Sequence, residues 1–236
     1  MSDTFLDGRV VVRQPKNGFR SGLDAVMLAA SVPAKPADDA LELGAGAGVA
    51  SLCLAARTAC EVTGVEIDPA LVGLANENAS ANALAVRFVA ADIFDLPSDL
   101  KRDFAHVFCN PPFHEGEASP DTARDIALRD MGGLGDWLAL GLKRTVSGGS
   151  FGVILRADRL GEALSQLPAR GVSVIPLWPR ANASAKRVIV RVVKGSGAAL
   201  ALLPGLVLHE ADGRYTPQAD EILRDGGSLA LDSRGL

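Results

Sequence analysis

From residue 40 onward, short apolar stretches of strand length alternate with longer stretches of helix length. The strand-like stretches are 40–43, 62–67, 86–90, 104–109 and 151–155, and the helix-like stretches are 49–57, 69–82, 121–130, 134–146 and 160–167. A regular alternation of strand and helix is typical of a parallel sheet, because each crossover between parallel strands needs a helix. The pattern therefore predicts an α/β fold.

The pattern continues towards both ends of the chain. A strand at 10–12 and a helix at 22–32 come before the alternating region, and two strands at 172–177 and 188–193 come after it. A weakly patterned tail follows, with a strand near 206–209 and a helix near 217–224. One hydrophobic core is the usual organisation at 236 residues. We predict a single domain over 1–236, made of an extension (1–36), a core (37–195) and a tail (196–236).

The composition is that of a globular protein, with 48% apolar and 22% charged residues. No apolar run approaches the roughly 18 to 20 residues of a membrane-spanning helix, and the first residues do not resemble a signal peptide. Cys53, Cys60 and Cys109 lack CxxC spacing and stand in apolar surroundings. We therefore expect structural thiols, a cytoplasmic location, and neither a membrane nor a metal as partner.

The formal net charge of −4 argues against indiscriminate nucleic-acid binding, which depends on a surplus of Lys and Arg. Two segments depart from this average. Residues 9–20 carry four basic side chains and residues 180–194 carry five, and neither segment contains an acid. If the two segments meet in space they form one anion-binding patch; otherwise they are ordinary solvated faces beside apolar strands. Trp137, Trp178 and Tyr215 are scattered, and we interpret them as packing residues.

Three glycines at alternate positions, Gly44, Gly46 and Gly48, follow the strand predicted at 40–43. Glycine lacks a Cβ and tolerates positive φ, so the backbone can turn sharply here and approach a ligand. The helix that follows directs its free N–H groups at a carboxylate or phosphate. A dinucleotide G-x-G-x-x-G motif would require glycine at position 49, where Val49 stands. The loop therefore indicates a nucleotide-like ligand, and Val49 argues against a dinucleotide.

Two acids follow the next two predicted strands. Glu66 stands about twenty residues after the glycine loop, where a carboxylate can accept both hydroxyls of a ribose. NAD and S-adenosylmethionine share that ribose, so Glu66 does not choose between them. Asp92 suits a hydrogen bond from an adenine amino group. The alternative is a helix-capping or solvated acid for Glu66 and a surface acid for Asp92.

The sequence Asn110-Pro111-Pro112-Phe113 ends the strand predicted at 104–109. Each proline fixes its own φ and restricts the residue before it, so the loop is stiff. The Asn110 side-chain oxygen and a loop carbonyl, that of Pro111, can each accept one hydrogen of a planar NH₂ group. Phe113 offers an apolar face on which a base or amide can stack. A tight turn with an apolar anchor would explain the prolines but not the asparagine.

These motifs, in this order, resemble the class I S-adenosylmethionine-dependent methyltransferases, in particular the NPPY/F branch that methylates exocyclic or amide nitrogens. The motifs are Leu41-Glu42-Leu43-Gly44-Ala45-Gly46-Ala47-Gly48, Val65-Glu66-Ile67-Asp68, Ala91-Asp92 and Asn110-Pro111-Pro112-Phe113. The resemblance implies a Rossmann-like, seven-stranded, mostly parallel sheet with a reversed last hairpin. It also implies that S-adenosylmethionine lies over Gly44 to Gly48, with its ribose on Glu66, its adenine beside Asp92 and Ile93, and Glu42 among the cofactor-binding residues.

The ends of the chain refine the resemblance. The segment 17–30, which contains Gly22-Leu23-Asp24-Ala25, is similar to the N-terminal segment of the bacterial tRNA(Val) adenine-N6 methyltransferases. That similarity places Asp24 near the cofactor, with a helix cap as the alternative, and makes Arg20, Lys186 and Arg187 candidates for RNA binding. Phe113-His114, in contrast, resembles the ribosomal-RNA guanine-N2 methyltransferases, and His114 is a candidate for loop shaping or substrate contact. We expect tRNA as the partner, with rRNA as the alternative; the oligomeric state stays open.

Other functions remain as alternatives. A protein glutamine amide offers the same NH₂ group as adenine or guanine. A nicotinamide oxidoreductase on a similar fold is disfavoured by Val49, and a non-catalytic RNA-binding module is disfavoured because the glycine loop and residues 110–113 are both complete.

Overall fold

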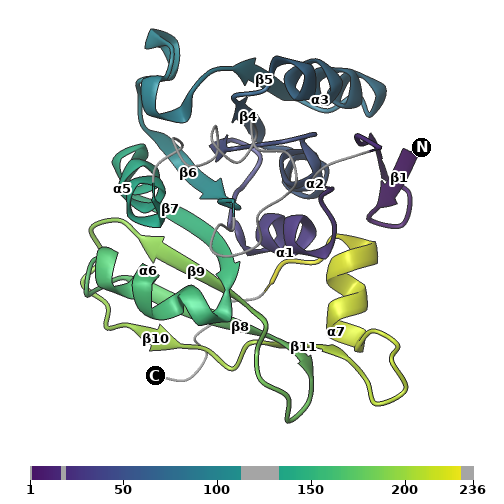
Figure 1. The fold of residues 1–236 in the computed structure, drawn as a ribbon, viewed down its shortest axis with the longest axis vertical. Helices are drawn as coiled ribbons and strands as arrows, with labels where there is room; N and C mark the ends of the chain where they lie inside the picture. The colour runs from purple at the N-terminus through teal and green to yellow at the C-terminus, as the bar shows by residue number, and fades with distance from the viewer. Residues whose placement is uncertain (1, 17–19, 113–132, 230–236) are drawn as a thin grey trace, which may run out of the picture.

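The computed structural model describes residues 2–16, 20–112 and 133–229. Within these residues the main sheet has nine strands in the order β10-β8-β9-β7-β6-β3-β4-β5, with β11 beside β8 (Figure 1). The strands are β3 (Asp39–Leu43), β4 (Glu61–Glu66), β5 (Val86–Ala90), β6 (Phe104–Cys109), β7 (Thr145–Arg156), β8 (Val172–Arg180), β9 (Arg187–Val193), β10 (Ala201–Leu202) and β11 (Leu206–His209). The helices are α1 (Leu23–Ser31), α2 (Val49–Thr58), α3 (Pro69–Ala81), α5 (Leu134–Lys143), α6 (Leu160–Gln166) and α7 (Pro217–Asp220).

The strand directions confirm the predicted fold class. Strands β3 to β7 run parallel to one another, and β9 is antiparallel to both of its neighbours, β7 and β8. The seven expected strands are therefore β3 to β9, with one reversed. Two short strands, β10 and β11, extend the sheet beyond β8. The sequence predicts β11 but not the two-residue β10, which is too short to leave a pattern. The helix predicted at 121–130 lies outside the described residues.

Helices cover both faces of the sheet, as a doubly wound fold requires. Successive side chains of a strand point to opposite faces, and this alternation divides the interior into two cores. Ile154 and Ile189 face α1, α2, α3 and α7, whereas Val153 and Val190 face α5 and α6. The tail returns to the first of these faces, where the Leu229 amide donates to the Ala30 carbonyl of α1.

A small hairpin of β1 (Ser2–Phe5) and β2 (Val10–Arg13) stands apart from the main sheet. Two asparagine side chains of α3, one turn apart, replace a neighbouring strand. The Asn82 amide exchanges hydrogen bonds of 2.8 Å with the N–H and C=O of Val11, and the Asn78 amide does the same with Arg13 at 2.9 and 3.0 Å. Asn78 also donates to the Ala47 carbonyl, at 3.1 Å. The hairpin is thereby tied to the glycine loop. The sequence reading misses β1, because its pattern is polar.

No helix in the described part of the chain combines the length and apolar character that crossing a membrane requires. Likewise, no three His, Cys, Asp or Glu side chains of the described residues gather in a group that could hold a metal ion.

All three cysteines are buried and free, as predicted for structural thiols. Burial raises the pKa of each thiol, to about 12 for Cys53, which leaves almost no reactive thiolate at neutral pH. We expect a thiol reagent such as DTNB to react with none of them in the native protein within minutes and with all three after unfolding in guanidinium. Fast reaction of one thiol in the native protein would contradict this burial.

Candidate active site

The register of the sheet brings the two predicted loops together. Leu43, the last residue of β3, is paired with Cys109 of β6 on one side and with Val65 of β4 on the other. Gly44 and Asn110 each come one residue later, so they leave neighbouring strands at the same level, about 5 Å apart. Glu66 follows Val65 and is paired with Ala90 of β5. The carboxyl ends of four adjacent strands thus carry the predicted site.

The glycine loop has the predicted conformation. Gly44, Gly46 and Gly48 have φ values of 71°, 55° and 87°, all in the left-handed region. The amides of Gly44 and Ala45 both donate to the Val65 carbonyl, at 2.9 and 3.0 Å, and this fixes the turn out of β3. Gly48 is the N-cap of α2 and offers no side-chain cap. Glu42 accepts the Ser51 N–H, which leaves the N–H groups of Val49 and Ala50 for a ligand.

Aromatic rings support this loop from within the protein. A Cβ on Gly44 would lie 2.8 Å from the Trp137 ring, and a Cβ on Gly48 would overlap the Phe88 ring. A Cβ on Gly46 would meet nothing within 4 Å. The loop is therefore closely packed on one side and has open space at its middle glycine, where a ligand can approach the backbone. Trp137 is 2% exposed, which confirms its interpretation as a packing residue.

The two predicted acids lie at the rim of this space. Glu66 is half-buried, and its two oxygens accept the N–H groups of Gly46 and Asp68 at 2.9 and 3.0 Å. Each carboxylate oxygen has a further lone pair, so both can still accept a ribose hydroxyl. Asp92 is exposed and caps the short 3₁₀ helix Ile93–Asp95, because its Oδ1 accepts the Phe94 N–H at 2.8 Å. The exposure of Asp92 fits its alternative as a surface acid, its Oδ1 also caps this short helix, and its other oxygen is left for a ligand.

Two exposed apolar side chains stand beside these acids. Ile67 follows Glu66 and is 47% exposed, and Phe94 lies two residues after Asp92 and is 42% exposed. Exposed large apolar side chains beside a ligand-sized space are typical of a site for a flat apolar group. The sequence analysis does not predict either side chain as part of the site. A large apolar residue one position after Glu66 and two positions after Asp92 is the signal that could have found them.

Glu42 lies beneath the loop. It is 3% exposed and accepts hydrogen bonds from the backbone N–H and the hydroxyl of Ser51, in the first turn of α2. These contacts make Glu42 a support for the start of the helix, and its direct contact with a cofactor stays a prediction. Burial, with a smaller contribution from the nearby Glu66, raises the pKa of Glu42 to about 8 against the opposing effect of the Ser51 hydrogen bonds.

The raised pKa of Glu42 predicts a pH-dependent stability. In the unfolded chain a glutamic acid ionises near pH 4.5, whereas folded Glu42 keeps its proton until about pH 8. Between these values the folded state holds one more proton, so stability falls as pH rises, by about 1 kcal/mol per pH unit. We expect Glu42→Gln to remove this slope, with a gain over the wild type of about 3 kcal/mol at pH 8 relative to pH 5.

Urea unfolding at pH 5, 6, 7 and 8 measures this slope, and the exposed Glu61→Gln variant is the matched control for loss of a charge. Parallel stability curves for the wild type and Glu42→Gln would show that Glu42 is ionised throughout.

Asn110 begins the loop after β6. Its Oδ1 is buried and has no hydrogen-bond partner among the described residues. A buried acceptor without a partner costs about 1 to 3 kcal/mol, so such atoms are rare and often functional. Pro111 is buried and Pro112 half-buried, which holds the loop in place. Phe113 and His114 lie outside the described residues.

The remaining predicted residues lie around this site. Asp24, at the start of α1, accepts a 2.7 Å hydrogen bond from Arg187 Nε. Arg20 is paired with Asp3 of the hairpin, and Lys186 is exposed. Roles of these side chains in binding stay predictions, because each described contact is within the protein.

The two basic segments do not form one continuous patch. From the first, Arg9 donates to the Leu6 and Arg224 carbonyls. From the second, Lys194 donates to the Thr145 carbonyl at the opposite edge of the sheet. The hypothesis of a single patch is therefore wrong for these residues, because several of the cations satisfy backbone carbonyls instead.

Comparisons with known proteins give the same class of enzyme as the motifs of this site. The family model described as "Methyltransferase small domain" matches residues 21–130. A tRNA1(Val) (adenine(37)-N6)-methyltransferase from Haemophilus influenzae is 25% identical over 91% of this chain and 94% of its own length. A solved structure from Agrobacterium tumefaciens, described as a predicted O-methyltransferase, superposes with a TM-score of 0.71 at 28% identity, over 88% of this chain and 98% of that one. The chain is an S-adenosylmethionine-dependent methyltransferase.

A further relative matches the methyltransferase over a shorter span. The protein of the same description from Shewanella amazonensis is 36% identical over 52% of this chain and 53% of its own length. The match to this relative thus has the higher identity but covers only about half of either chain.

The residues of the site fit S-adenosylmethionine. The open space at Gly46 admits a ligand close to the backbone, and the free N–H groups of α2 suit its carboxylate. Glu66 has lone pairs for the ribose, and Asp92 has one oxygen for the adenine amine, beside apolar Ile67 and Phe94. When bound, the cofactor supplies an electrophilic methyl group.

Proposed function

We propose that this methyltransferase acts on the exocyclic N6 amine of an adenine in tRNA. The observation that carries the proposal is the buried Oδ1 of Asn110, which has no hydrogen-bond partner in the described part of the chain and lies one residue beyond the Leu43–Cys109 pair that joins β3 to β6. An acceptor in this position suits a substrate that brings its own N–H donor. An N6 amine of adenine carries two such hydrogens.

Two acceptors position the amine. Asn110 Oδ1 accepts one hydrogen, and the Pro111 carbonyl accepts the other. Both bonds come from one side of the amine, so they direct the nitrogen lone pair away from the base ring and towards the glycine loop. Orientation of this kind contributes on the order of 7 to 11 kcal/mol in well-aligned reactions. The proton leaves to solvent after the transfer, so the described residues need to supply no strong base.

The names of the relatives favour tRNA as the substrate. The Haemophilus influenzae and Shewanella amazonensis proteins are both described as acting on adenine 37 of tRNA1(Val). A guanine N2 amine and a glutamine amide would meet the same two acceptors, so the choice of acceptor rests on these relatives rather than on the geometry.

The proposal is tested by incubating the purified protein and methyl-labelled S-adenosylmethionine with three substrates: an unmodified tRNA(Val) transcript, ribosomal RNA, and total protein. We expect label in tRNA, recovered as N6-methyladenosine after nuclease digestion. A transcript with guanosine in place of adenine 37 is the matched control and should stay unlabelled. Label only in rRNA or in protein would overturn the tRNA assignment and leave the amine-methylating chemistry intact.

A further inference from the structure

Cationic side chains also lie along the edge of the sheet that carries the active site, on the strands beyond β6 and away from the cofactor loop. The strands beyond β6 follow in the order β7, β9, β8 and β11. Asn110 follows the end of β6, Arg156 ends β7, and Arg187 begins the reversed β9 and is paired with Arg156. Arg180 ends β8 and is paired with His209 of β11. All of these residues therefore lie at the same end of the sheet, on strands about 5 Å apart. The pairing places Arg156 and Arg187 two residues beyond the level of Asn110, and Arg180 three residues beyond the level of Arg187.

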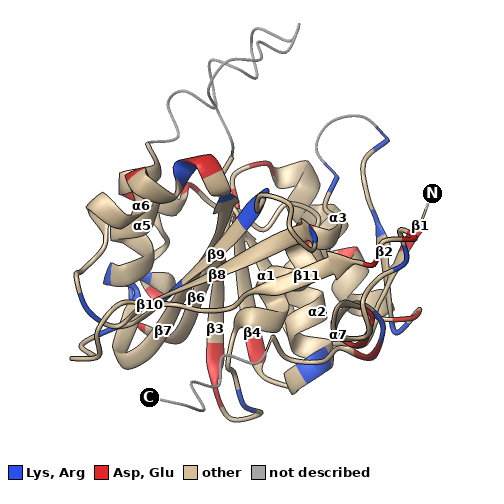
Figure 2. Cartoon of the chain, turned by 90° about the horizontal axis from the view of Figure 1, so that it is seen from below, with Lys and Arg blue, Asp and Glu red and all other residues tan. Residues whose placement is uncertain are grey.

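This part of the edge is positively charged. Lys186 and Arg180 are exposed and form no ion pair within the described residues. Arg187 is paired with Asp24, and Arg156 with Asp158. Four cations therefore face two acids. Figure 2 shows blue segments at the upper ends of the strands, near β8 and β9. The protein as a whole carries −4, so this local excess is a departure from the average.

An exposed pair of aromatic rings ends this row. Tyr215 is 38% exposed and stacks on His209, with ring centroids 4.9 Å apart and planes inclined by 27°. The His209 ring is held in turn by a 3.1 Å hydrogen bond between its Nδ1 and the Pro179 carbonyl. The interpretation of Tyr215 as a packing residue is therefore wrong, because the tail presents its ring to solvent on a rigid neighbour.

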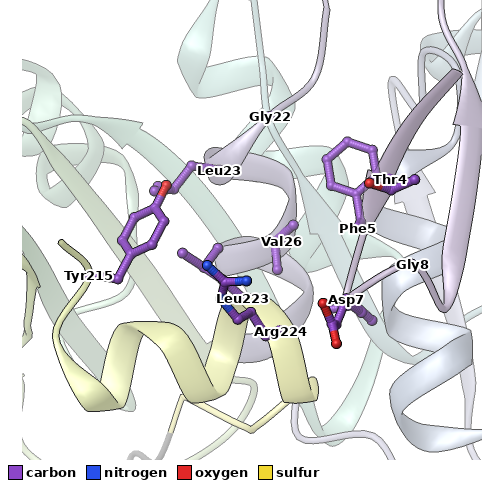
Figure 3. Close-up of a pocket in the computed structure, with 11 residues that line it drawn as sticks. Thr4, Phe5, Asp7, Gly8, Gly22, Leu23, Val26, Tyr215, Leu223 and Arg224 are labelled. Atoms are coloured by element: carbon purple, nitrogen blue, oxygen red, sulfur yellow. The ribbon is translucent and has the colours of Figure 1, made fainter. Parts of the chain in front are cut away.

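A cavity of about 310 Å³ opens beside this ring, between the N-terminal hairpin, α1 and the tail. Figure 3 shows Tyr215 next to Leu23 at one end of the cavity and Asp7 near Arg224 at the other. Leu23 directly precedes Asp24, which binds Arg187, so the aromatic end of the cavity adjoins the cationic row. The cavity combines an aromatic ring and apolar side chains with polar groups, as ligand sites do.

We propose that the cations Arg156, Arg187, Lys186 and Arg180 carry the RNA backbone from Asn110 to Tyr215, where an unpaired base of the same RNA stacks on the Tyr215 ring. This inference rests on the proposed function, because it assumes an RNA substrate. It adds a second base-binding position, remote from the methylated base. Phosphates are bound by Lys and Arg, and bases by exposed aromatic rings, in single-stranded RNA recognition generally.

The dimensions suit an RNA loop. Four strand spacings separate β6 from β11, about 19 Å across the sheet, and the stagger of five residues adds about 16 Å along the strands, which gives about 25 Å between the target base and the stacking base. Stacked nucleotides advance about 3.4 Å each, so the row accommodates up to about seven nucleotides. A trinucleotide centred on the target base is too short to reach Tyr215.

The test compares Tyr215→Ala and Tyr215→Leu with Tyr215→Phe, which keeps the ring, and with Leu202→Ala, a control in which an exposed apolar side chain of β10 is lost. Affinity for an unmodified tRNA(Val) transcript is measured by fluorescence anisotropy over a series of salt concentrations. We expect Ala and Leu at 215 to weaken binding by about 5- to 150-fold, as for loss of one stacked base. Tyr215→Phe and Leu202→Ala should stay within about twofold of the wild type.

Two further readouts separate stacking from charge and from folding. Arg180→Gln and Lys186→Gln should each reduce the salt slope by about one, whereas Tyr215→Ala should leave the slope unchanged. Affinity for S-adenosylmethionine and the thermal midpoint should be the same in all variants. On a trinucleotide substrate, Tyr215→Ala and the wild type should have equal KM values.

The outcomes distinguish this inference from the proposed function. A wild type that methylates tRNA, with Tyr215→Ala and Tyr215→Leu both folded and unchanged in tRNA affinity, would overturn the inference and leave the function intact. A wild type that neither binds nor methylates RNA would overturn both.

Discussion

Replacing Asn110 by alanine should lower turnover by at least about 100- to 1000-fold, the cost of removing one preorganised polar group from an active site. In the proposed mechanism the side-chain oxygen is one of two acceptors that orient the amine, so alanine would leave one N–H of the substrate without a partner. Affinity for S-adenosylmethionine should stay within a few-fold, because the cofactor contacts that we propose lie on the glycine loop, Glu66 and Asp92. Single-turnover methylation and calorimetry measure the two quantities separately.

The same substitution should leave the free energy of unfolding equal to or above that of the wild type. Asn110 Oδ1 is buried without a partner among the described residues, so its removal relieves a cost instead of breaking a contact. Loss of activity without loss of stability is the signature of a residue kept for function.

Two variants control for position and chemistry at this site. Asn110→Asp keeps an acceptor oxygen at the same distance and should retain more activity than Asn110→Ala. Asn110→Gln carries the same amide one methylene further and should be as inactive as Asn110→Ala. If Asn110→Ala kept most of its activity, the assignment of Asn110 would be wrong.

Replacing Gly48 by alanine should destabilise the protein by about 2 to 5 kcal/mol. Two costs add. The left-handed conformation, with a φ of 87°, costs a residue with a Cβ about 1 to 2 kcal/mol. The new Cβ would also overlap the buried Phe88 ring, and overpacking a core costs about 1 to 3 kcal/mol. Urea unfolding at constant pH measures the loss, and the shift of α2 should also weaken S-adenosylmethionine binding.

Gly46→Ala is the matched control for Gly48→Ala. Gly46 has a comparable φ of 55°, but its Cβ would meet nothing within 4 Å. We expect it to lose only the conformational part, about 1 to 2 kcal/mol. Equal losses in the two variants would show that Phe88 moves aside and that the loop is not held from below.

Local signals were sufficient for the elements of the core. The strand predicted at 86–90 is β5 to the residue, and the helix predicted at 69–82 is α3, which begins after Asp68, whose side chain accepts the Ala70 N–H at 2.8 Å. Short-range hydrogen bonding and the periodicity of apolar residues decide such features, so they can be read from neighbouring residues alone. β1 and β10 were missed because a polar or two-residue strand leaves no such pattern.

The contacts and the exposure of the charged and aromatic side chains could not be predicted from such local signals. The sequence left open whether the two basic segments form one patch, and the structure divides them, because Arg9 and Lys194 bind backbone carbonyls that folding brings to them. The chain turns back after β11 and places Tyr215 opposite His209, so one face of the Tyr215 ring stacks on His209 while part of the ring stays exposed. Partners of this kind are far apart in the sequence or depend on the path of a loop.

The sequence by itself determined the α/β architecture, the order of its strands and helices along the chain, and the glycine and Asn-Pro-Pro loops with their stiff or permissive backbones, because these depend on residue type and short-range spacing. Only the tertiary structure decided that Asn110 lies beside Gly44, that Trp137 and Phe88 lie beneath the glycines, and that a cationic edge leads to Tyr215. The pairing register of the sheet sets these relations, and register is fixed by the packing of both faces at once.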